Sequence, residues 1–434
     1  MLAILGFIMV AVFMYLIMSK RLSALVALIL VPVVFALIGG FAPDLANLMS
    51  TGIKNIAPTG VLLIFGILYF GIMIDTGLFD PVVNQVLKFV KGDPLKISVG
   101  TAILVLVVSL DGDGATTFMI TVSAMLPLYK KLNMNPLILA CIAMMGNGVM
   151  NILPWGGPTA RVMSSLHLES SQVFTPLIPA MIAAAVYTLF VAYHFGLKER
   201  KRLGVIQLDS AFDAEPQLNA ELSAALQPFE LRRPKLLWFN FLLTLTLLVG
   251  LIFNILPLNV MFMIATAVAL TVNYPDLKDQ QKRIASHAGN ALAVGSMVFA
   301  AGIFTGILSG TKMVDAMGHA VVALIPDSLG NYLAIITALT SMPFTFFMSN
   351  DAFYFGILPI IAEAAAKYGI PAEVIGRASL LGQTVHLLSP LVASTYLLVG
   401  LVGVNFGDHQ RFTMKWAIGT TLVMLIICLI TGVL

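Results

Sequence analysis

Apolar segments of membrane-spanning length recur along this chain and leave it few ways to fold. A helix needs roughly 20 apolar residues to cross the hydrocarbon core of a bilayer. Ten segments meet this requirement within a few residues: 2–18, 22–40, 57–76, 136–158, 174–196, 236–254, 258–274, 285–309, 372–402 and 413–433. Hydrophobic residues form 59% of the 434 residues and charged residues only 10%, a composition foreign to soluble domains. We predict an all-α polytopic membrane protein that lies in the lipid bilayer.

Two further apolar stretches, about 96–129 and 331–367, each contain a polar interruption at the centre. The first reads Ser-Leu-Asp-Gly-Asp-Gly at 109–114, and the second reads Ser-Asn-Asp at 349–351. Carboxylates at membrane depth are costly, and irregular backbone persists there only where it lines a cavity walled by protein. Each stretch resembles two helices, each too short to cross, joined by a polar tip. We predict two re-entrant hairpins whose tips reach the binding site of a transporter.

The positive-inside rule assigns a side of the membrane to the basic residues between these segments. Seven basic clusters fall on one side if the first hairpin opens there: 20–21, 88–96, 130–131, 198–202, 232–235, 278–283 and 411–415. That side is predicted to be the cytoplasm, so the second hairpin opens outward and both termini lie outside the cytoplasm. The net charge of +3 comes from these short clusters and indicates no nucleic-acid partner.

The two halves of the chain match in three blocks that occur in the same order. Segments 70–77 and 299–306 share Phe, Ile, Thr and Gly in register. Segments 146–159 and 382–395 share Gly, Val, Pro and Thr, and each half also carries one hairpin tip. Each half is predicted to contain five crossings and one hairpin, and because five is odd the second copy must be upside down. This is the inverted repeat architecture, whose binding site lies near the midplane of the membrane.

The only long polar stretch of the sequence separates the two halves. It carries two basic clusters around a middle that contains Asp and Glu, and we predict a mobile cytoplasmic linker. The predicted parts are a first repeat (1–196), the linker (197–235) and a second repeat (236–434).

Two of the predicted helices contain residues that cannot continue a regular helix. Proline lacks a backbone donor and glycine loosens the backbone. A broken helix exposes N–H groups that suit a carboxylate and carbonyl oxygens that suit a cation. The residues predicted to bind substrate come from these breaks and from the two hairpin tips: Asn147, Asn151, Gly156, Gly157, Thr159, Ser389, Ser394, Thr395, Ser109, Asp111, Gly112, Asp113, Thr116, Ser349, Asn350 and Asp351.

The aspartates at the tips change the chemistry expected of this site. A site for a bare anion would avoid carboxylates, because like charges repel. Asp111, Asp113 and Asp351 among hydroxyl and amide oxygens are instead suited to a hard divalent cation such as Mg²⁺ or Ca²⁺. An anion delivered as a metal chelate would satisfy both kinds of group. The alternative is that these aspartates only cap the helices that follow them.

Several other titratable residues lie in or beside these helices. His386 stands in the second interrupted helix, at the position matching Met150, and Asp75 lies near the end of a helix. Both are candidate proton carriers, although a packing role is favoured for His386. Arg161 and Arg377 flank the interrupted helices, where a loop or interfacial role is favoured over pairing with substrate carboxylates.

Three motifs resemble those of a known family: Ser109–Phe118, Gly146–Thr159 and Ser349–Gly356. They are similar to the citrate–metal:proton symporters, the CitMHS family of the ion transporter superfamily, and the resemblance covers essentially the whole chain. It implies a carrier in a bacterial plasma membrane that takes up citrate, or a related tricarboxylate, complexed with a divalent metal and coupled to protons. The metal would travel as part of the substrate, and no separate cofactor is implied.

Relatives in that superfamily, such as the divalent anion:sodium symporters, carry Ser-Asn-Thr at both tips. Asp111 and Asp351 stand here where Thr would be, which favours a metal-bearing substrate over a simple sodium site. The same relatives are dimers with an elevator motion, so the resemblance implies an elevator-type homodimer. The moving unit is then assigned to 77–196 and 300–434, and the scaffold with the dimer contact to 2–70 and 236–299.

Other functions remain open on the sequence. A metal-independent carboxylate symporter coupled to protons or sodium, or a sodium/proton antiporter, would share this fold. An intramembrane metalloenzyme is disfavoured because the sequence contains neither His-Glu-x-x-His nor clustered histidines. A channel is disfavoured because two re-entrant tips can close the site on each side in turn. We therefore expect a transporter and not an enzyme.

Overall fold

The computed structural model describes residues 2–434 except 20, 91, 205–228, 254 and 324–325. The described part of the chain consists of helices and connecting turns without a strand, and this confirms the predicted all-α class. The elements before the linker are α1 (Leu2–Met18), α2 (Ala24–Ile38), α3 (Leu45–Asp75), α4 (Asp80–Val90), α5 (Pro94–Val108), η1 (Ser109–Asp111), α6 (Gly114–Lys131), α7 (Pro136–Met150), α8 (Gly157–Leu166), α9 (Ser170–Val173), η2 (Thr175–Leu177) and α10 (Ile178–Leu203).

The second half repeats the order of helix types found in the first. Two helices, a long helix, a short helix, a hairpin, a broken helix and a final long helix follow one another. The elements are η4 (Phe229–Leu231), η5 (Pro234–Leu236), α12 (Leu237–Phe253), α13 (Leu258–Asn273), α14 (Leu277–Gly310), α15 (Met313–Val322), α16 (Asp327–Gly330), α17 (Leu333–Phe347), η6 (Ala352–Ile357), α18 (Leu358–Ala366), α19 (Ala372–Leu380), α20 (Gln383–His386), α21 (Ala393–Val402) and α22 (Phe406–Ile430).

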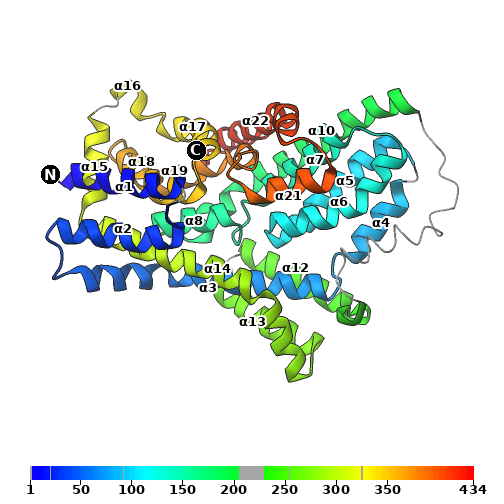
Figure 1. The fold of residues 1–434 in the computed structure, drawn as a ribbon, viewed down its shortest axis with the longest axis horizontal. Coiled ribbons are helices and arrows are strands. Elements are labelled where there is room, and N and C mark those ends of the chain that lie inside the picture. The colour runs from blue at the N-terminus through cyan, green and yellow to red at the C-terminus, as the bar shows by residue number, and fades with distance from the viewer. Residues whose placement is uncertain (1, 20, 91, 205–228, 254, 324–325) are drawn as a thin grey trace.

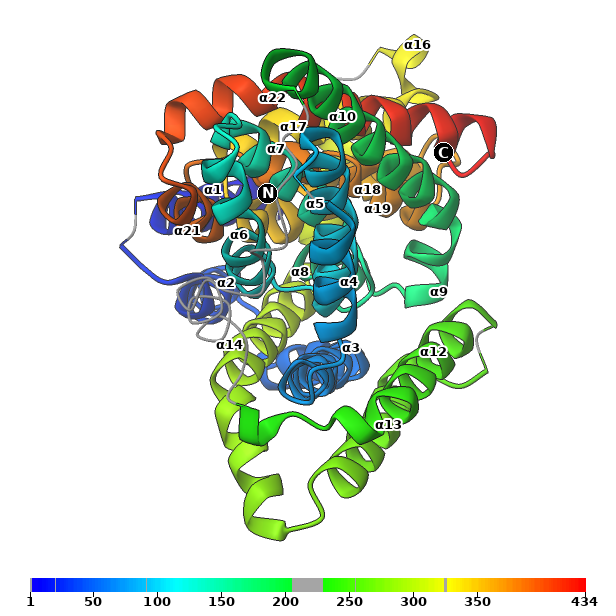
Figure 2. The same cartoon turned by 90° about the vertical axis from the view of Figure 1, so that its right-hand side faces the viewer.

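Helices α3 and α14 form the long base of the molecule. They pack against each other, and α13 packs on another side of α3. Figure 2 shows α3, α12, α13 and α14 together at the bottom, with the hairpins and broken helices above them. The layered arrangement can also be followed in Figure 1, where α3 and α14 run side by side.

Both long helices begin earlier than the sequence predicts, at Leu45 and Leu277 instead of near 57 and 285. Their first turns carry polar residues, which a hydropathy window excludes although the helix itself accepts them. The Asp276 side chain accepts a hydrogen bond from the backbone N–H of Lys278 at 2.7 Å and caps the start of α14. Capping thus sets the start of α14, whereas α3 has no side-chain cap and its first turns pack against α14 through Leu48 and Gly52.

Two predicted boundaries elsewhere are also corrected. Helix α10 continues to Leu203, beyond the predicted end at 196, and Arg202 pairs with Glu199 at 2.5 Å in its final turns. The short helices α4 and α15 were not predicted, because segments of 11 and 10 residues fall well below a membrane span. The predicted mobility of the linker falls largely on 205–228, outside the described residues.

Six of the described helical segments are long and apolar enough to cross a membrane. The sequence predicts ten crossings; three of those helices have only 15 to 17 residues, and two are broken into pieces. One of the six, Pro94–Asp111, is the first arm of hairpin 1 (α5, η1 and α6). That arm is therefore longer than the sequence suggests, because a 3-10 turn extends it to 18 residues.

The two hairpins contact both interrupted helices. Helix α6 of hairpin 1 packs against α7 and α21, and α17 of hairpin 2 (α17, η6 and α18) packs against α19 and α20. Both hairpin tips are consequently held next to broken backbone, which positions the candidate site.

Candidate functional site

Hairpin 1 reverses direction at Gly112, which adopts a left-handed conformation with φ of +77°. A side chain there would be strained, and its Cβ would lie 3.0 Å from the Trp155 ring. The next residue, Asp113, begins α6 as its N-cap. Its carboxylate accepts hydrogen bonds from the N–H groups of Ala115 and Thr116 at 3.3 and 3.0 Å, and from the Thr116 hydroxyl at 2.6 Å. Both Asp113 oxygens are thus used to start the helix.

Asp111 differs from Asp113 in its surroundings. Its side chain is buried, and Oδ1 accepts hydrogen bonds from the Asp113 N–H at 2.9 Å and the Thr117 hydroxyl at 3.5 Å. Its second oxygen, Oδ2, is buried with no hydrogen-bond partner. A buried carboxylate oxygen without a partner is costly in free energy, so this atom is a candidate for binding a ligand.

The break between α7 and α8 is tied to the tip of hairpin 1. The Trp155 indole N–H donates to the Leu110 carbonyl at 2.8 Å, and the Asn147 amide donates to the Ser109 hydroxyl at 3.5 Å. The Thr159 hydroxyl donates to the Ile152 carbonyl at 2.7 Å. Thr159 thus satisfies the broken backbone itself, whereas Trp155, which the sequence analysis did not single out, fixes the tip.

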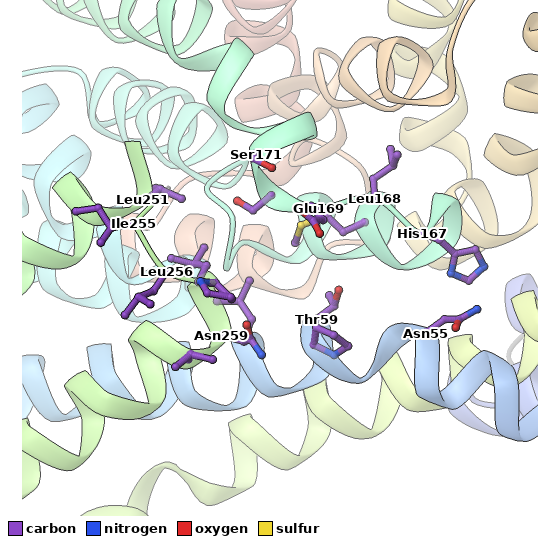
Figure 3. A pocket seen from close by; sticks show the side chains of 17 residues that line it. Asn55, Thr59, His167, Leu168, Glu169, Ser171, Leu251, Ile255, Leu256 and Asn259 are labelled. Carbon is purple, nitrogen blue, oxygen red and sulfur yellow. The ribbon is translucent and has the colours of Figure 1, made fainter. Parts of the chain in front are cut away.

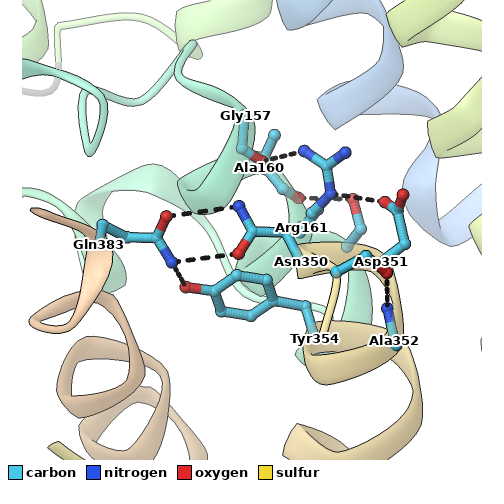
Figure 4. A network of polar contacts seen from close by, with 10 residues as sticks. Gly157, Ala160, Arg161, Asn350, Asp351, Ala352, Tyr354 and Gln383 are labelled. Carbon is cyan, nitrogen blue, oxygen red and sulfur yellow. Dashed lines mark hydrogen bonds and ion pairs between the residues drawn. The ribbon is translucent and has the colours of Figure 1, made fainter. Parts of the chain in front are cut away.

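Hairpin 2 carries an ion pair at its tip. Arg161 Nε lies 2.7 Å from Asp351 Oδ1, and its guanidinium also donates to the Gly157 carbonyl at 3.0 Å (Figure 4). The expected loop or interfacial role of Arg161 is therefore wrong, because Arg161 lies within α8 and its side chain reaches the tip. Asp351 makes no capping bond at the start of the following helix. Hairpin 2 continues from there as a π-helix, a deformation frequent at functional sites.

Gln383 holds the tip of hairpin 2 from the second interrupted helix. It exchanges two hydrogen bonds with the Asn350 amide, both at 3.3 Å, and donates to the Tyr354 hydroxyl at 2.7 Å (Figure 4). Gln383 is a site residue that was not predicted from the sequence. Its match to Asn147 in the repeat was the available signal, since Asn147 also contacts a hairpin tip, although through one hydrogen bond to Ser109.

Polar residues in the second break mainly satisfy nearby backbone. The Ser389 hydroxyl donates to the Phe346 carbonyl at 2.6 Å, and the Thr395 hydroxyl donates to the Leu387 carbonyl. His386 Nδ1 contacts the Thr345 carbonyl at 2.6 Å, which requires this nitrogen to carry the proton. Thr395 stabilises the break from within, whereas Ser389 and His386 fix it against α17.

The remaining predicted residues lie around the same breaks. A Cβ added to Gly114 would lie 3.2 Å from both Asn147 Oδ1 and Ser394 Oγ, so these two side chains flank the start of α6. Asn151 is the C-cap of α7. A Cβ added to Gly156 would lie 2.1 Å from the carbonyl oxygen of Asn151. The Ser349 hydroxyl accepts a hydrogen bond from the backbone N–H of Ala352 at 3.2 Å.

The three aspartates do not form the predicted joint metal site. No group of three or more His, Cys, Asp or Glu side chains suited to a metal exists among the described residues. Asp113 is engaged in capping α6, and Asp351 is paired with Arg161. A resident metal held by three carboxylates is therefore not supported, because two of the three have other partners.

Asp75 belongs to a separate cluster between α3 and α14, in which Asp75 is buried and its two partners are partly exposed. Its Oδ2 lies 2.8 Å from His287 Nε2 and 3.2 Å from Arg283 Nη1, and Oδ1 is buried without a partner. His287 lies flat against α3, since a Cβ on Gly71 would meet its ring at 2.6 Å. The sequence indicates Asp75 alone and gives no sign of its two partners more than 200 residues away.

A cavity of about 650 Å³ lies between α3, the α8–α9 connection and the α12–α13 connection (Figure 3). Polar residues in its lining include Asn55, Thr59, His167, Glu169 and Asn259. None of the residues predicted to bind substrate lines this cavity.

Apolar helices around two polar hairpin tips and two broken helices define a membrane transporter. The family model of the citrate transporters, CitMHS, matches residues 8–382, and the chain belongs to this family. The predicted resemblance is thereby confirmed. Members of the family are transporters, so the protein is a multi-pass membrane transporter and not an enzyme.

Two curated relatives come from Bacillus subtilis. A citrate transporter is 67% identical over 434 residues and covers 100% of both chains. A Mg(2+)/citrate complex secondary transporter is 54% identical over 433 residues, covering 100% of this chain and 99% of its own. Among solved structures, the Alcanivorax borkumensis YdaH transporter aligns with a TM-score of 0.55 over 90% of this chain and 89% of its own. At 13% identity this last likeness concerns the fold alone.

Proposed function

We propose that this protein is a secondary active symporter that takes up citrate complexed with a divalent metal ion, together with protons, across a bacterial plasma membrane. The observation that carries the proposal is the presence of both signs of charge at the hairpin tips. Asp111 has a free buried oxygen at one tip, and Arg161 with Asp351 provides a cation and an anion at the other. A relative at 54% identity is named for the complex of Mg(2+) with citrate, which supports the same choice of substrate.

A chelate suits this site better than either component. Citrate itself supplies oxygen ligands to the metal, and Mg²⁺ commonly keeps several waters and takes only one or two protein carboxylates. Three clustered aspartates are then unnecessary. The carboxylates of citrate that do not bind the metal would be held by Arg161 and by N–H groups at the start of α8.

The repeat and the elevator motion belong to the same proposal. The Asn147–Ser109 contact of the first half and the Gln383–Asn350 contact of the second join matched residues of the broken helices to neighbouring positions of the two tips, which supports two related halves. We infer that the halves are inverted, that both termini lie outside the cytoplasm and that hairpins and broken helices move against α3 and α12–α14. A homodimer would use the scaffold, where α12 and α13 expose apolar side chains such as Trp238 and Ile264.

Uptake of labelled citrate into proteoliposomes tests the function. We expect uptake with Mg²⁺ or Ca²⁺ to exceed uptake in excess chelator by at least about tenfold, and an inward proton gradient to accelerate it. Equal uptake with and without metal would favour a metal-independent carboxylate symporter. Stimulation by a sodium gradient and not by a proton gradient would contradict proton coupling.

For proton coupling, we favour Asp75 over His386. Asp75 has a buried oxygen without a partner, whereas His386 Nδ1 is already bonded to a backbone carbonyl. Replacing Asp75 with Asn is expected to lower proton-driven uptake by at least about tenfold, while equilibrium binding of the metal–citrate complex stays unchanged. Proton coupling is measured as acidification of the proteoliposome lumen, recorded together with citrate entry. His386→Gln is the comparison, and a larger loss of acidification in that variant would reverse the assignment.

A further inference from the structure

The Arg161–Asp351 ion pair joins two distant parts of the chain at the candidate site. The residues are 190 positions apart, and the pair links α8 to the tip of hairpin 2 (Figure 4). The side chains are 23% and 14% exposed. This exposure leaves the pair within reach of a ligand, while the surrounding protein removes most of the water that would otherwise solvate two separated charges.

Asp351 depends on Arg161 for its interactions. Within the described part of the chain, the carboxylate has no other hydrogen bond or ion pair. The helix that begins beside it receives no capping bond from it. Loss of Arg161 would therefore leave an unpaired, largely buried anion, which is strongly unfavourable.

Arg161 lies next to open space at the start of α8. A Cβ added to Gly157 would meet only the Arg161 guanidinium within 4 Å. Gly157 begins α8 and no side chain caps it. Pro158 has no N–H, and the Ala160 N–H donates to the Gly156 carbonyl at 3.1 Å. The N–H groups of Gly157 and Thr159 are therefore the ones left beside the guanidinium for an anionic group.

We propose that Arg161 and Asp351 neutralise each other when no substrate is bound, and that the substrate replaces this ion pair, with its metal pairing with Asp351 and a citrate carboxylate pairing with Arg161. This exchange of partners makes metal and citrate bind together or not at all. The proposal rests on the function proposed above. A bare metal ion at Asp351 would leave Arg161 unpaired beside a second cation. Free citrate at Arg161 would leave Asp351 unpaired beside a second anion. Only the complex gives Asp351 a cation and Arg161 a carboxylate in one step.

Binding to the purified protein tests this coupling without transport. Titration calorimetry would use citrate in excess EDTA, Mg²⁺ alone, and Mg²⁺ with citrate. The wild-type protein is expected to bind the complex at least about 100-fold more tightly than either component. Asp351→Asn should bind free citrate at least about tenfold more tightly than the wild type does, with little further gain from Mg²⁺. Arg161→Gln should gain affinity for Mg²⁺ alone.

Two further variants control for folding and for general charge effects. Arg161→Lys keeps the charge and should keep the preference for the complex, even if affinity falls. Glu363→Gln with Lys367→Gln removes another ion pair of hairpin 2, 3.2 Å long on α18, and should bind like the wild type. Size-exclusion chromatography and thermal unfolding would verify that each variant is folded.

The outcomes separate this inference from the proposed function. Suppose that the wild type binds the complex, but Asp351→Asn still requires metal to bind citrate and Arg161→Gln gains no affinity for Mg²⁺. The proposed exchange of partners is then wrong, while the proposed function stands. Loss of the preference for the complex in Arg161→Lys would also overturn the proposed exchange of partners, because lysine retains the positive charge. If the wild type does not bind the complex at all, the proposed function itself fails.

Discussion

Metal-dependent citrate uptake is expected to be abolished when Asp111 or Asp351 is replaced with asparagine. Each substitution removes one negative charge while keeping the size of the side chain. Truncating one member of a buried charge interaction commonly costs about 2–5 kcal/mol, equivalent to a loss of at least about 30-fold. Initial uptake rates in proteoliposomes, normalised to the amount of inserted protein, measure the effect.

Asp113 provides the matched comparison at the same tip. Its oxygens accept hydrogen bonds at the start of α6, and Asn caps a helix about as well as Asp does. Asp113→Asn should therefore lose much less activity than Asp111→Asn. Equal losses at the two positions would show that Asp113 has a further role, and full activity in both Asp111→Asn and Asp351→Asn would refute the site.

The folded protein is expected to be lost when Gly52 is replaced with valine. A Cβ at Gly52 would lie 2.0 Å from the Gly302 carbonyl oxygen and 2.8 Å from Gly306 Cα. Both contacts are to the backbone of α14, so no side chain can move aside and the two longest helices must separate. Overpacking typically costs about 1–3 kcal/mol, and a clash with backbone lies at or above the upper end. Fluorescence-detected size-exclusion chromatography and thermal unfolding in detergent provide the measurement.

A second glycine of α14 gives the control for this substitution. Gly289 has nothing within 4 Å of an added Cβ. Gly289→Ala should leave the yield unchanged and stabilise the helix by about 0.5–1 kcal/mol, since alanine has the higher helix propensity. If Gly52→Val folds as well as the wild type, the close contact of α3 with α14 is wrong.

Hydropathy and polar interruptions predict much of the fold because they are local properties. The apolar segment 2–18 coincides with α1, and the polar tips at 109–114 and 349–351 coincide with the reversals of the two hairpins. The starts of α3 and α14 were missed for the same reason. The start of α3 is held by packing against α14, and the start of α14 is capped by Asp276; no hydropathy window records either contact.

The candidate site was predictable as a set of segments but not as a set of contacts. The sequence indicates Asp111 and Asp113 equally, two positions apart at one tip. In the folded protein one oxygen of Asp111 stays buried without a partner, whereas Asp113 caps α6. The difference arises from the 3-10 turn and the left-handed Gly112, which direct the two carboxylates to different backbone groups.

The sequence by itself determined the helical membrane class, the two polar tips and the family, because each depends on residues that are neighbours in the chain. Only the tertiary structure decided which polar groups meet. Arg161 reaches Asp351 and Gln383 reaches Asn350 because broken helices end beside the hairpin tips. The first of these pairs spans 190 residues, and the geometry of both depends on how whole helices pack, which no local pattern specifies.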